Sequence, residues 1–373
     1  MSGQKTNDKR EERLQRILSA GFDVVAARGA DHTSISDVAA RAEVTRPTIY
    51  NYVGDIDGLF AEMWLANGAE FLRNLADPQD EFLVGDSSKA QVLAELLAIS
   101  HRNREVEEVV LATARNWWQA QSESSDLDKA MLVWRVALRL GAILSLPVLK
   151  SADFARLVVN AATAAAPAGR STTATAATAI DLPETREPKP SSDPEQRLID
   201  SAIAIISSSG VPATSMARIA RISGLSSAAA YARFENAFAV VIQSYGQVAA
   251  SIIEENLGIA SSTSFNPQSY GAFLRHGLSA ERKVWRNYRL EMHVEARVNA
   301  ELRDYLRTQF NEANDKVLPG LVKFNVDSQG MEAALAIIHF LGIGLGVLQS
   351  AGIPVRDLQH EAAAAGVIQS LSA

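Results

Sequence analysis

Apolar residues recur at helical spacing along most of the chain, which predicts an all-α protein. One apolar face runs through residues 14–25, and Gly29 follows as a left-handed C-cap. Ile35, Val38 and Ala39 form the apolar face of a second, shorter helix. Further helices are predicted at 46–53, 59–72, 90–100, 106–120, 130–149, 153–165, 198–206, 237–257, 270–278, 281–298, 300–317, 330–350 and 355–371.

Two of these short helices are joined by a tight turn at Glu43. Ser34 has the residue type of an N-cap, and Asp37 three residues later completes a capping box. Thr45 caps the next helix, which tolerates the early Pro47 because first-turn amides have no intrahelical partner. This arrangement predicts a helix-turn-helix, whose second helix enters the major groove of DNA.

The second helix presents polar side chains at its start. Arg46 can bond a guanine edge and Asn51 an adenine edge, while Thr and Tyr hydroxyls can bond phosphate oxygens. The alternative is a helical hairpin in an ordinary bundle, but the cap, turn and polar tip together favour DNA binding. The candidate DNA-binding residues of this segment are Ser34, Thr45, Arg46, Pro47, Thr48, Tyr50, Asn51 and Tyr52.

The stretch 33–53, TSISDVAARAEVTRPTIYNYV, resembles the TetR family of bacterial transcription regulators, whose pattern is a helix, a Gly, a Thr pair and then I-A-x-x-A-G-V-S-x-x-T-L-Y-x-Y-F. Two positions depart from this pattern. Glu43 stands where the family has a turn glycine, and Ile56 where it has a phosphate-binding lysine, which should weaken non-specific affinity. The resemblance implies a three-helix DNA-binding head, a helical body with a ligand cavity, and dimerisation through the last two helices of each body.

The opening pattern returns in the second half of the chain. Shifting the sequence by 181 positions aligns Gly29 with Gly210 and Tyr50 with Tyr231, without a gap. We interpret this as an internal duplication that yields two tandem TetR-like units. The predicted segments are a first head at 1–58, a first body at 59–165, an Ala, Thr and Pro-rich linker at 166–193, a second head at 194–239 and a second body at 240–373.

The recognition helix of the second head, SSAAAYARF, is poor in hydrogen-bonding side chains. Alanine can touch a thymine methyl group but cannot bond a base edge. One interpretation is a weaker second reader, which the persistence of Tyr231 and Arg233 favours; the other is a head kept for packing. The candidate contacts of this head are Ser226, Ser227, Tyr231 and Arg233.

Composition narrows the class of protein. The chain of 373 residues is 47% hydrophobic, enough for several helical cores, and it has no cysteine, which excludes disulfides and fits a reducing cytoplasm. We expect no apolar run long enough to span a bilayer, and hence a cytoplasmic protein without a membrane partner. The net charge of −7 confines DNA binding to a local patch. The basic residues between 5 and 16 are one candidate, although three acids among them make a plain solvated face an equal alternative.

No sequence motif indicates an enzyme, a metal site or a cofactor, since Gly-rich phosphate loops, G-x-S-x-G and H-E-x-x-H are all absent. The expected partners are operator DNA and a small apolar effector that releases a repressor. The alternative is a helical ligand sensor or adaptor that has lost DNA binding. Core packing is an alternative role for each of the candidate ligand residues, which are Trp117, Trp118, Trp134, Trp285, Tyr288, His293 and Arg297.

The duplication predicts that the two units pair within one chain as a pseudo-dimer, with higher oligomers left open. Because the two recognition helices differ, the operator should lack a true palindrome. Gly342, Gly344 and Gly346 lie in a helix of the second body and are predicted to let a partner helix approach closely.

Overall fold

The computed structural model describes residues 2–78, 88–149, 151–164, 191–262, 267–321 and 328–371. Within these ranges the chain is helical and contains no strand, so the predicted all-α class is confirmed. Most of the predicted linker, at 166–193, lies outside the described residues.

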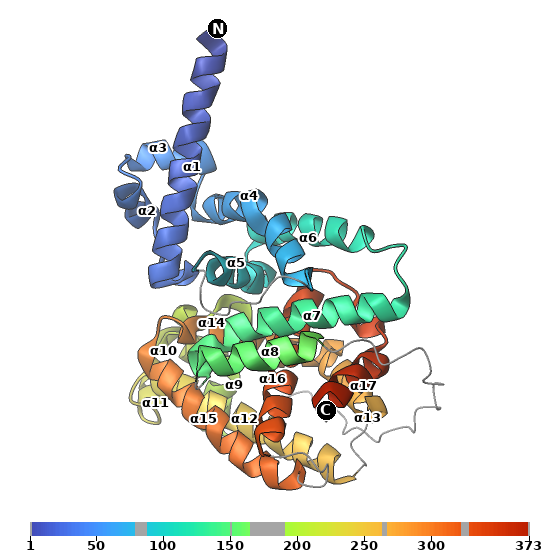
Figure 1. The fold of residues 1–373 in the computed structure, drawn as a ribbon. Helices are drawn as coiled ribbons and strands as arrows, with labels where there is room; N and C mark the ends of the chain where they lie inside the picture. The colour runs from blue at the N-terminus through green and yellow to red at the C-terminus, as the bar shows by residue number, and fades with distance from the viewer. Residues whose placement is uncertain are drawn as a thin grey trace.

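The first head consists of α1 (Ser2–Arg28), α2 (Ile35–Arg41) and α3 (Arg46–Val53), with the 3-10 helix η1 (Ala30–His32) after α1. Gly29 turns the chain between α1 and η1 with a φ of 83°, in the region that only glycine enters readily. Figure 1 shows α1 rising well beyond α2 and α3. The buried core of the head includes Ile17, Leu18, Val25, Ile35, Val38, Ala39, Ile49 and Val53.

The second head repeats this succession with α9 (Pro194–Ser209), η4 (Val211–Ala213), α10 (Met216–Ser223) and α11 (Ser227–Tyr231). Gly210, at the end of α9, again has a positive φ, 81°. The recognition helix α11 has 5 residues, whereas α3 has 8. The core of the second head includes Leu198, Ile199, Ala202, Ile206, Met216, Ile219, Ala220 and Ala230.

The two bodies complete the chain. The first contains α4 (Ile56–Ala76), α5 (Ser88–Ile99), η2 (Ser100–Arg102), α6 (Arg104–Gln119), α7 (Asp126–Ser145), η3 (Leu146–Val148) and α8 (Ala152–Ala164). The second contains α12 (Ala237–Ser262), α13 (Pro267–Gly277), η5 (Ala280–Arg282), α14 (Lys283–Ala296), α15 (Ala300–Leu321), α16 (Ser328–Ser350), η7 (Val355–Asp357) and α17 (His360–Leu371).

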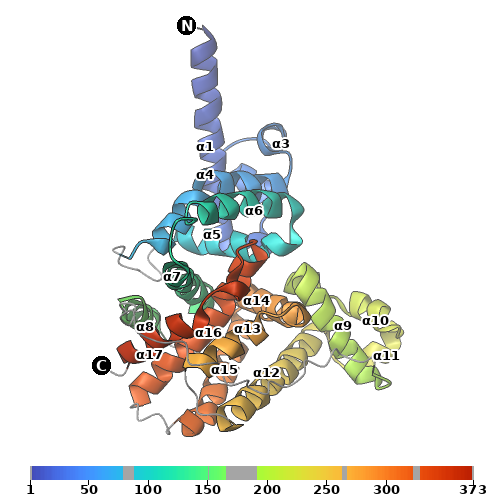
Figure 2. The same ribbon diagram turned by 90° about the vertical axis from the view of Figure 1, so that its right-hand side faces the viewer.

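The first body shares its core with part of the second body. Figures 1 and 2 show α4 to α6 next to the first head and the second body in the lower half. In Figure 1, α7 and α8 run across the middle. A single apolar cluster runs from the first head through the first body into α13, α16 and α17, whereas a second cluster joins the second head to α12, α14 and α15.

The two bodies meet where α7 crosses α16, inside a four-helix contact that also includes α8 and α17. A Cβ on Gly141 would lie 2.0 Å from the carbonyl oxygen of Phe340, and a Cβ on Gly344 would lie 1.9 Å from that of Ala137. The helices therefore touch backbone to backbone. Gly344 acts as predicted, and this close approach accounts for two glycines inside long helices.

The other two predicted glycines face elsewhere. A Cβ on Gly342 would lie 3.2 Å from the Arg289 guanidinium, and one on Gly346 would lie 3.5 Å from the Arg286 side chain. Both glycines line a cavity of the second body, described below.

Three stretches of the described residues are long and apolar enough to cross a membrane, judged by length and composition alone: Asp126–Val148, Ala237–Glu255 and Glu332–Ser350. The expectation that no such run exists was therefore wrong. The apolar windows of the first and third are 72% and 56% buried inside the protein. Their composition follows from helices that contact other helices on most of their faces. The second stretch is only 22% buried and forms part of the cavity wall.

We predict that Gly141→Ala destabilises the chain, because the new Cβ collides with backbone atoms that have no rotamer to escape into. The expected loss in free energy of unfolding is about 1–3 kcal/mol, despite the gain of about 1 kcal/mol in helix propensity. Urea denaturation measures this loss. The control is Gly277→Ala, which meets no atom within 4 Å and should shift stability by less than about 0.5 kcal/mol. A Gly141→Ala chain as stable as its parent contradicts the close crossing.

Candidate nucleic-acid interface

The first head fixes its helix-turn-helix with side-chain caps. The Ser34 hydroxyl accepts a hydrogen bond from the Asp37 backbone N–H at 3.2 Å and donates one to the Asp37 carboxylate at 2.6 Å. The capping box thus closes through side chains rather than through the Ser34 amide. The Ser34 hydroxyl, with Arg28, also lowers the pKa of Asp37. At the next helix the Thr45 hydroxyl accepts from the Thr48 N–H at 3.4 Å, as its N-cap position predicts.

The turn between α2 and α3 contains an unusual backbone conformation. Glu43 has a φ of 55° and is the only non-glycine residue with positive φ in the described part of the chain. In the second head the same place, 181 residues later, is occupied by Gly224, whose φ is 69°. The turn therefore keeps the left-handed conformation even where the sequence lacks the glycine that suits it.

The recognition helix α3 divides into a packed face and an open face. Ile49 and Val53 are buried against the core of the head. Arg46, Tyr50 and Asn51 are exposed, with Tyr50 51% accessible. Of the other predicted contacts, Ser34, Thr45 and Pro47 are exposed, and Thr48 and Tyr52 are half-buried. None of the predicted residues of the first head is therefore buried in its core.

Arg46 differs from two nearby arginines in having no protein partner. Arg28 contacts Asp37 at 2.6 Å and Arg41 contacts Asp23 at 2.5 Å, and both pairs tie α2 to α1. Within the described ranges, Arg46 forms neither a salt bridge nor a hydrogen bond. The scaffold therefore uses two of its cations for structure and leaves the third available to a ligand.

The projecting helix α1 adds positive charge beside α3. The Arg10 guanidinium lies 5.8 Å from the centre of the Tyr52 ring, a cation–π distance that joins the two helices. Lys9, Arg13 and Arg16 are exposed on the same helix. Exposed acids remain among them, so the surface is mixed in sign rather than uniformly basic.

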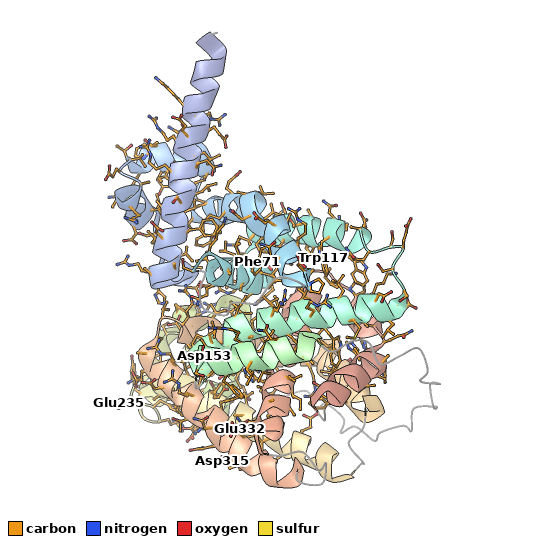
Figure 3. The ribbon with its side chains drawn as sticks, in the orientation of Figure 1. Phe71, Trp117, Asp153, Glu235, Asp315 and Glu332 are labelled. Atoms are coloured by element: carbon orange, nitrogen blue, oxygen red, sulfur yellow. The ribbon has the colours of Figure 1, made fainter. Side chains whose placement is uncertain are left out.

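The second head presents a poorer surface. Ser226 caps α11 by accepting from the Ala229 N–H at 3.1 Å, and both Ser227 and Tyr231 are exposed, the latter by 58%. Arg233 is exposed too, but it donates to the Ala229 carbonyl at 2.8 Å and is held at the end of its own helix. Glu235, four residues after the end of α11, places a negative charge at the outer edge of the lower half in Figure 3.

This geometry of caps, turn and open recognition helix has a counterpart among known proteins. Residues 17–63 match the family described as bacterial regulatory proteins, tetR family. The first head is therefore similar to the N-terminal domain of the TetR family. Two curated relatives, both described as uncharacterized HTH-type transcriptional regulators, come from two strains of Mycobacterium tuberculosis. Each is 34% identical to this chain over 89 residues.

The similarity is confined to part of each protein. The aligned residues make up 24% of this chain and 43% of each relative, so this chain spans less than half the length of the curated relatives it matches. The TetR family match itself ends inside α4. The family match does not extend to the second head or the second body.

The second body contains a cavity of about 280 Å³ between α12, α13, α14, α15 and α16. Its wall is mainly apolar and includes Ile252, Phe273, Trp285, Phe310 and Ile338. Polar groups enter it from several helices, and α14 contributes Arg286 and Arg289.

Among the seven predicted ligand residues, Trp285 lies on the wall of this cavity. His293 stands behind the wall, with its Nε2 3.2 Å from Nε2 of His339, a lining residue. Trp117 and Trp118 lie in the first body, where Figure 3 shows Trp117 above α7. The other three have polar partners elsewhere, since Trp134 donates to His360, Tyr288 shares a hydrogen bond with Ser244, and Arg297 binds the first head.

Arg297, just after α14, is held against the end of α1. Its guanidinium donates to the carbonyl oxygens of Val25 and Ala26, both at 2.6 Å, and to Glu95 on α5 at 2.5 Å. Glu95 also accepts from the Ala30 N–H at 2.6 Å. Burial raises the pKa of Glu95, although Arg297 opposes this effect. Arg297 thus satisfies carbonyls at the last turn of α1 from the other half of the chain.

A second buried group extends this contact toward the second head. Glu291 on α14 accepts from the Arg102 Nε at 2.8 Å and lies 2.8 Å from the His101 Nε2. Arg102 also donates to Asp31 in η1 at 2.7 and 3.0 Å. A Cβ at Gly210 would lie 3.0 Å from both the Arg102 and the Asp31 side chains, so the turns of the two heads meet here. Sequence reasoning missed these residues because no local pattern marks partners this far apart.

We predict that Glu43→Gly stabilises the chain. A side chain in the left-handed region costs about 1–2 kcal/mol, and glycine removes this cost while losing part of the gain to backbone entropy. The expected net gain in free energy of unfolding is about 1 kcal/mol, measured by thermal denaturation. Gly224→Ala is the matched control in the second head and should lower stability. An unchanged or lower stability of Glu43→Gly contradicts the strain argument.

Proposed function

We propose that this chain is a sequence-specific regulator of transcription that binds double-stranded DNA mainly through its first head. The observation that carries the proposal is a capped recognition helix that exposes Arg46 and Asn51, with Arg46 free of salt bridges and hydrogen bonds among the described residues. Arginine matches the two acceptors of guanine, and asparagine matches the acceptor and donor of adenine. The TetR-family match covers this helix-turn-helix.

We further propose that the two halves are duplicated units that pair within one chain. The crossing of α7 and α16 supports this, because Gly141 meets Phe340 while Gly344 meets Ala137. A shift of 203 positions carries Gly141 to Gly344 and Ala137 to Phe340. The two contacts are therefore equivalent: in each, the glycine of one helix meets the residue that corresponds to Ala137 on the other helix. Such reciprocal contacts are typical of a two-fold interface. Both heads also lie on the left side of the molecule in Figure 1, one above the other.

The two heads contribute unequally in this proposal. The second head keeps a capped helix and an exposed Tyr231, but Arg233 bonds its own helix and Glu235 repels phosphate. We expect it to add phosphate contacts and little base reading. The operator then requires defined bases only in the half read by Arg46 and Asn51, and it has no true palindrome.

The regulatory part of the proposal is repression in the cytoplasm by promoter occupancy, relieved by a small effector bound in the second body. Helix α14 supports this route. Arg286 and Arg289 line the cavity, while Glu291 and Arg297, later on the same segment, hold the first head. A change in the packing of α14 therefore alters the position of the head that reads bases.

A second candidate function is a ligand sensor or adaptor without specific DNA binding. The alanines of α11 and the apolar Ile56, half-buried against the core in place of a phosphate-binding lysine, favour it. The two functions differ in one measurable property, since only the regulator selects a DNA sequence.

To separate them, purified protein is incubated with sheared bacterial genomic DNA at near-physiological salt, and the retained DNA is sequenced. We predict one enriched asymmetric motif. A perfect palindrome would contradict reading by two unequal heads and would indicate pairing between chains. Absence of enrichment, also at low salt where electrostatic binding is strengthened, supports the sensor instead.

We predict that Arg46→Ala weakens binding to the enriched motif by about 1–3 kcal/mol and relaxes selection at one base pair. Fluorescence anisotropy with a labelled duplex measures the loss. Arg233→Ala is the matched control from the second head and should weaken all sequences alike, by a smaller factor, with a shallower salt dependence. Equal losses of specificity in both variants would contradict the unequal roles of the heads.

A further inference from the structure

The cavity of the second body holds positive charge that the protein does not neutralise. No salt bridge among the described residues involves Arg286 or Arg289, both of which line it. Arg286 donates to the carbonyl oxygens of Gly277 and Ser279 at 2.9 and 2.6 Å. Arg289 donates to the His339 carbonyl at 3.0 Å. These neutral acceptors hold the two guanidinium groups in place but leave their charge uncompensated.

Arg289 is also short of hydrogen bonds. Its Nε is buried and has no partner among the described residues. Burial lowers the pKa of Arg289, and burial together with Arg282 lowers that of Arg286 to about 10. Both directions mean that the surroundings disfavour the cationic form. A cation partly removed from water and without an anionic partner is disfavoured, so an incoming anion would relieve this cost.

Other polar groups of the wall do not supply the missing anion. Arg282 and His276 share Glu255, at 2.5 and 3.1 Å, so that carboxylate is already engaged. Burial, Arg289 and His293 hold the pKa of His339 well below its usual value, and burial raises the pKa of the Tyr245 hydroxyl to about 12. Both side chains are therefore neutral hydrogen-bonding groups at pH 7.

The rest of the cavity suits an apolar chain. Its wall carries Ile252, Phe273, Leu274, Phe310 and Ile338. Gly342 and Gly346 have no side chain, so the space beside the two arginines stays free. Its volume of about 280 Å³ is close to the lower end of the roughly 300–1,000 Å³ typical of small-molecule pockets.

We propose that this cavity binds a medium-chain carboxylic acid, with the carboxylate on Arg289 and Arg286 and the alkyl chain among the apolar residues of α12, α13 and α15. Arginine is suited to this task because its planar fork pairs with both oxygens of a carboxylate. As a binding site the inference stands on the cavity alone, while its role as the effector site rests on the function proposed above.

Isothermal titration of the DNA-free, full-length chain with octanoate tests the proposal. We expect saturable one-to-one binding and an affinity that rises about fourfold for each methylene from butanoate to octanoate. Octan-1-ol and octylamine have the same chain with a neutral or cationic end, and they should bind at least tenfold more weakly. Equal affinities across the three head groups, or no octanoate binding at millimolar concentration, would overturn the proposal.

Arg289→Gln tests the anchoring residue. We expect octanoate affinity to fall about 10- to 100-fold, as for a lost charged hydrogen bond, while octan-1-ol binding stays unchanged. The matched control is Arg104→Gln, at an exposed arginine of α6 that pairs only with Glu108, and it should bind octanoate like the parent. Unchanged octanoate affinity in a folded Arg289→Gln chain counts against the proposal. If this variant does not fold, the comparison of octanoate, octan-1-ol and octylamine on the parent chain tests the proposal instead.

Titrating octanoate into the complex with the enriched DNA separates this inference from the function. Binding of octanoate with release of DNA supports both. Binding of octanoate to a chain that selects no DNA sequence supports the site and overturns the regulator.

Discussion

The contact between α7 and α16 sets the positions of everything else in the molecule. Gly141 and Gly344 bring two backbones into direct contact, so these helices cannot slide or rotate without collision. Because α7 belongs to the first half and α16 to the second, the crossing fixes one body against the other. The two heads extend from these bodies, and their relative position is therefore inherited from a contact in the middle of the fold. Close packing of this kind has discrete arrangements rather than a continuous range, which is what a switch between two states requires.

Helix α14 connects the parts that this crossing positions. One face lies on the cavity through Trp285 and Arg289, another packs Tyr288 and Met292 into the core of the second head, and its end holds the first head through Arg297. A rigid helix with three such faces transmits a displacement in any one of them to the other two. The ion pair between Arg297 and Glu95 at this end further fixes the position of α14, because separating the two groups would leave each charged and buried. The route from the cavity thus reaches both heads by contacts of a single element.

Local sequence signals predicted local structure well. Ser34, Thr45 and Ser226 cap the helices that their positions indicate, since a cap depends on residues within one turn of the chain. The cavity and the ion network were not predictable in this way. Arg297 and Glu95 carry no mark of pairing in the sequence, because their contact depends on how two bodies dock. For the same reason, the sequence could not tell a tryptophan that lines the cavity from one that packs in a core. Trp285 lies on the cavity wall and Trp134 in the shared core, although both stand in similar local patterns.

In the proposed pairing within one chain, the two heads can differ while the central crossing stays symmetric. In a homodimer every substitution appears twice, so a change that weakens one recognition helix weakens both. When both halves share a chain, the tether keeps the partner at high effective concentration and the second head can lose base contacts without loss of pairing. The crossing glycines remain under the same steric constraint in both halves, because either Cβ would break the contact. The structure accordingly combines a reciprocal interface with one head that exposes Arg46 and Asn51 and another whose corresponding helix exposes Ser227, Ala228 and Tyr231.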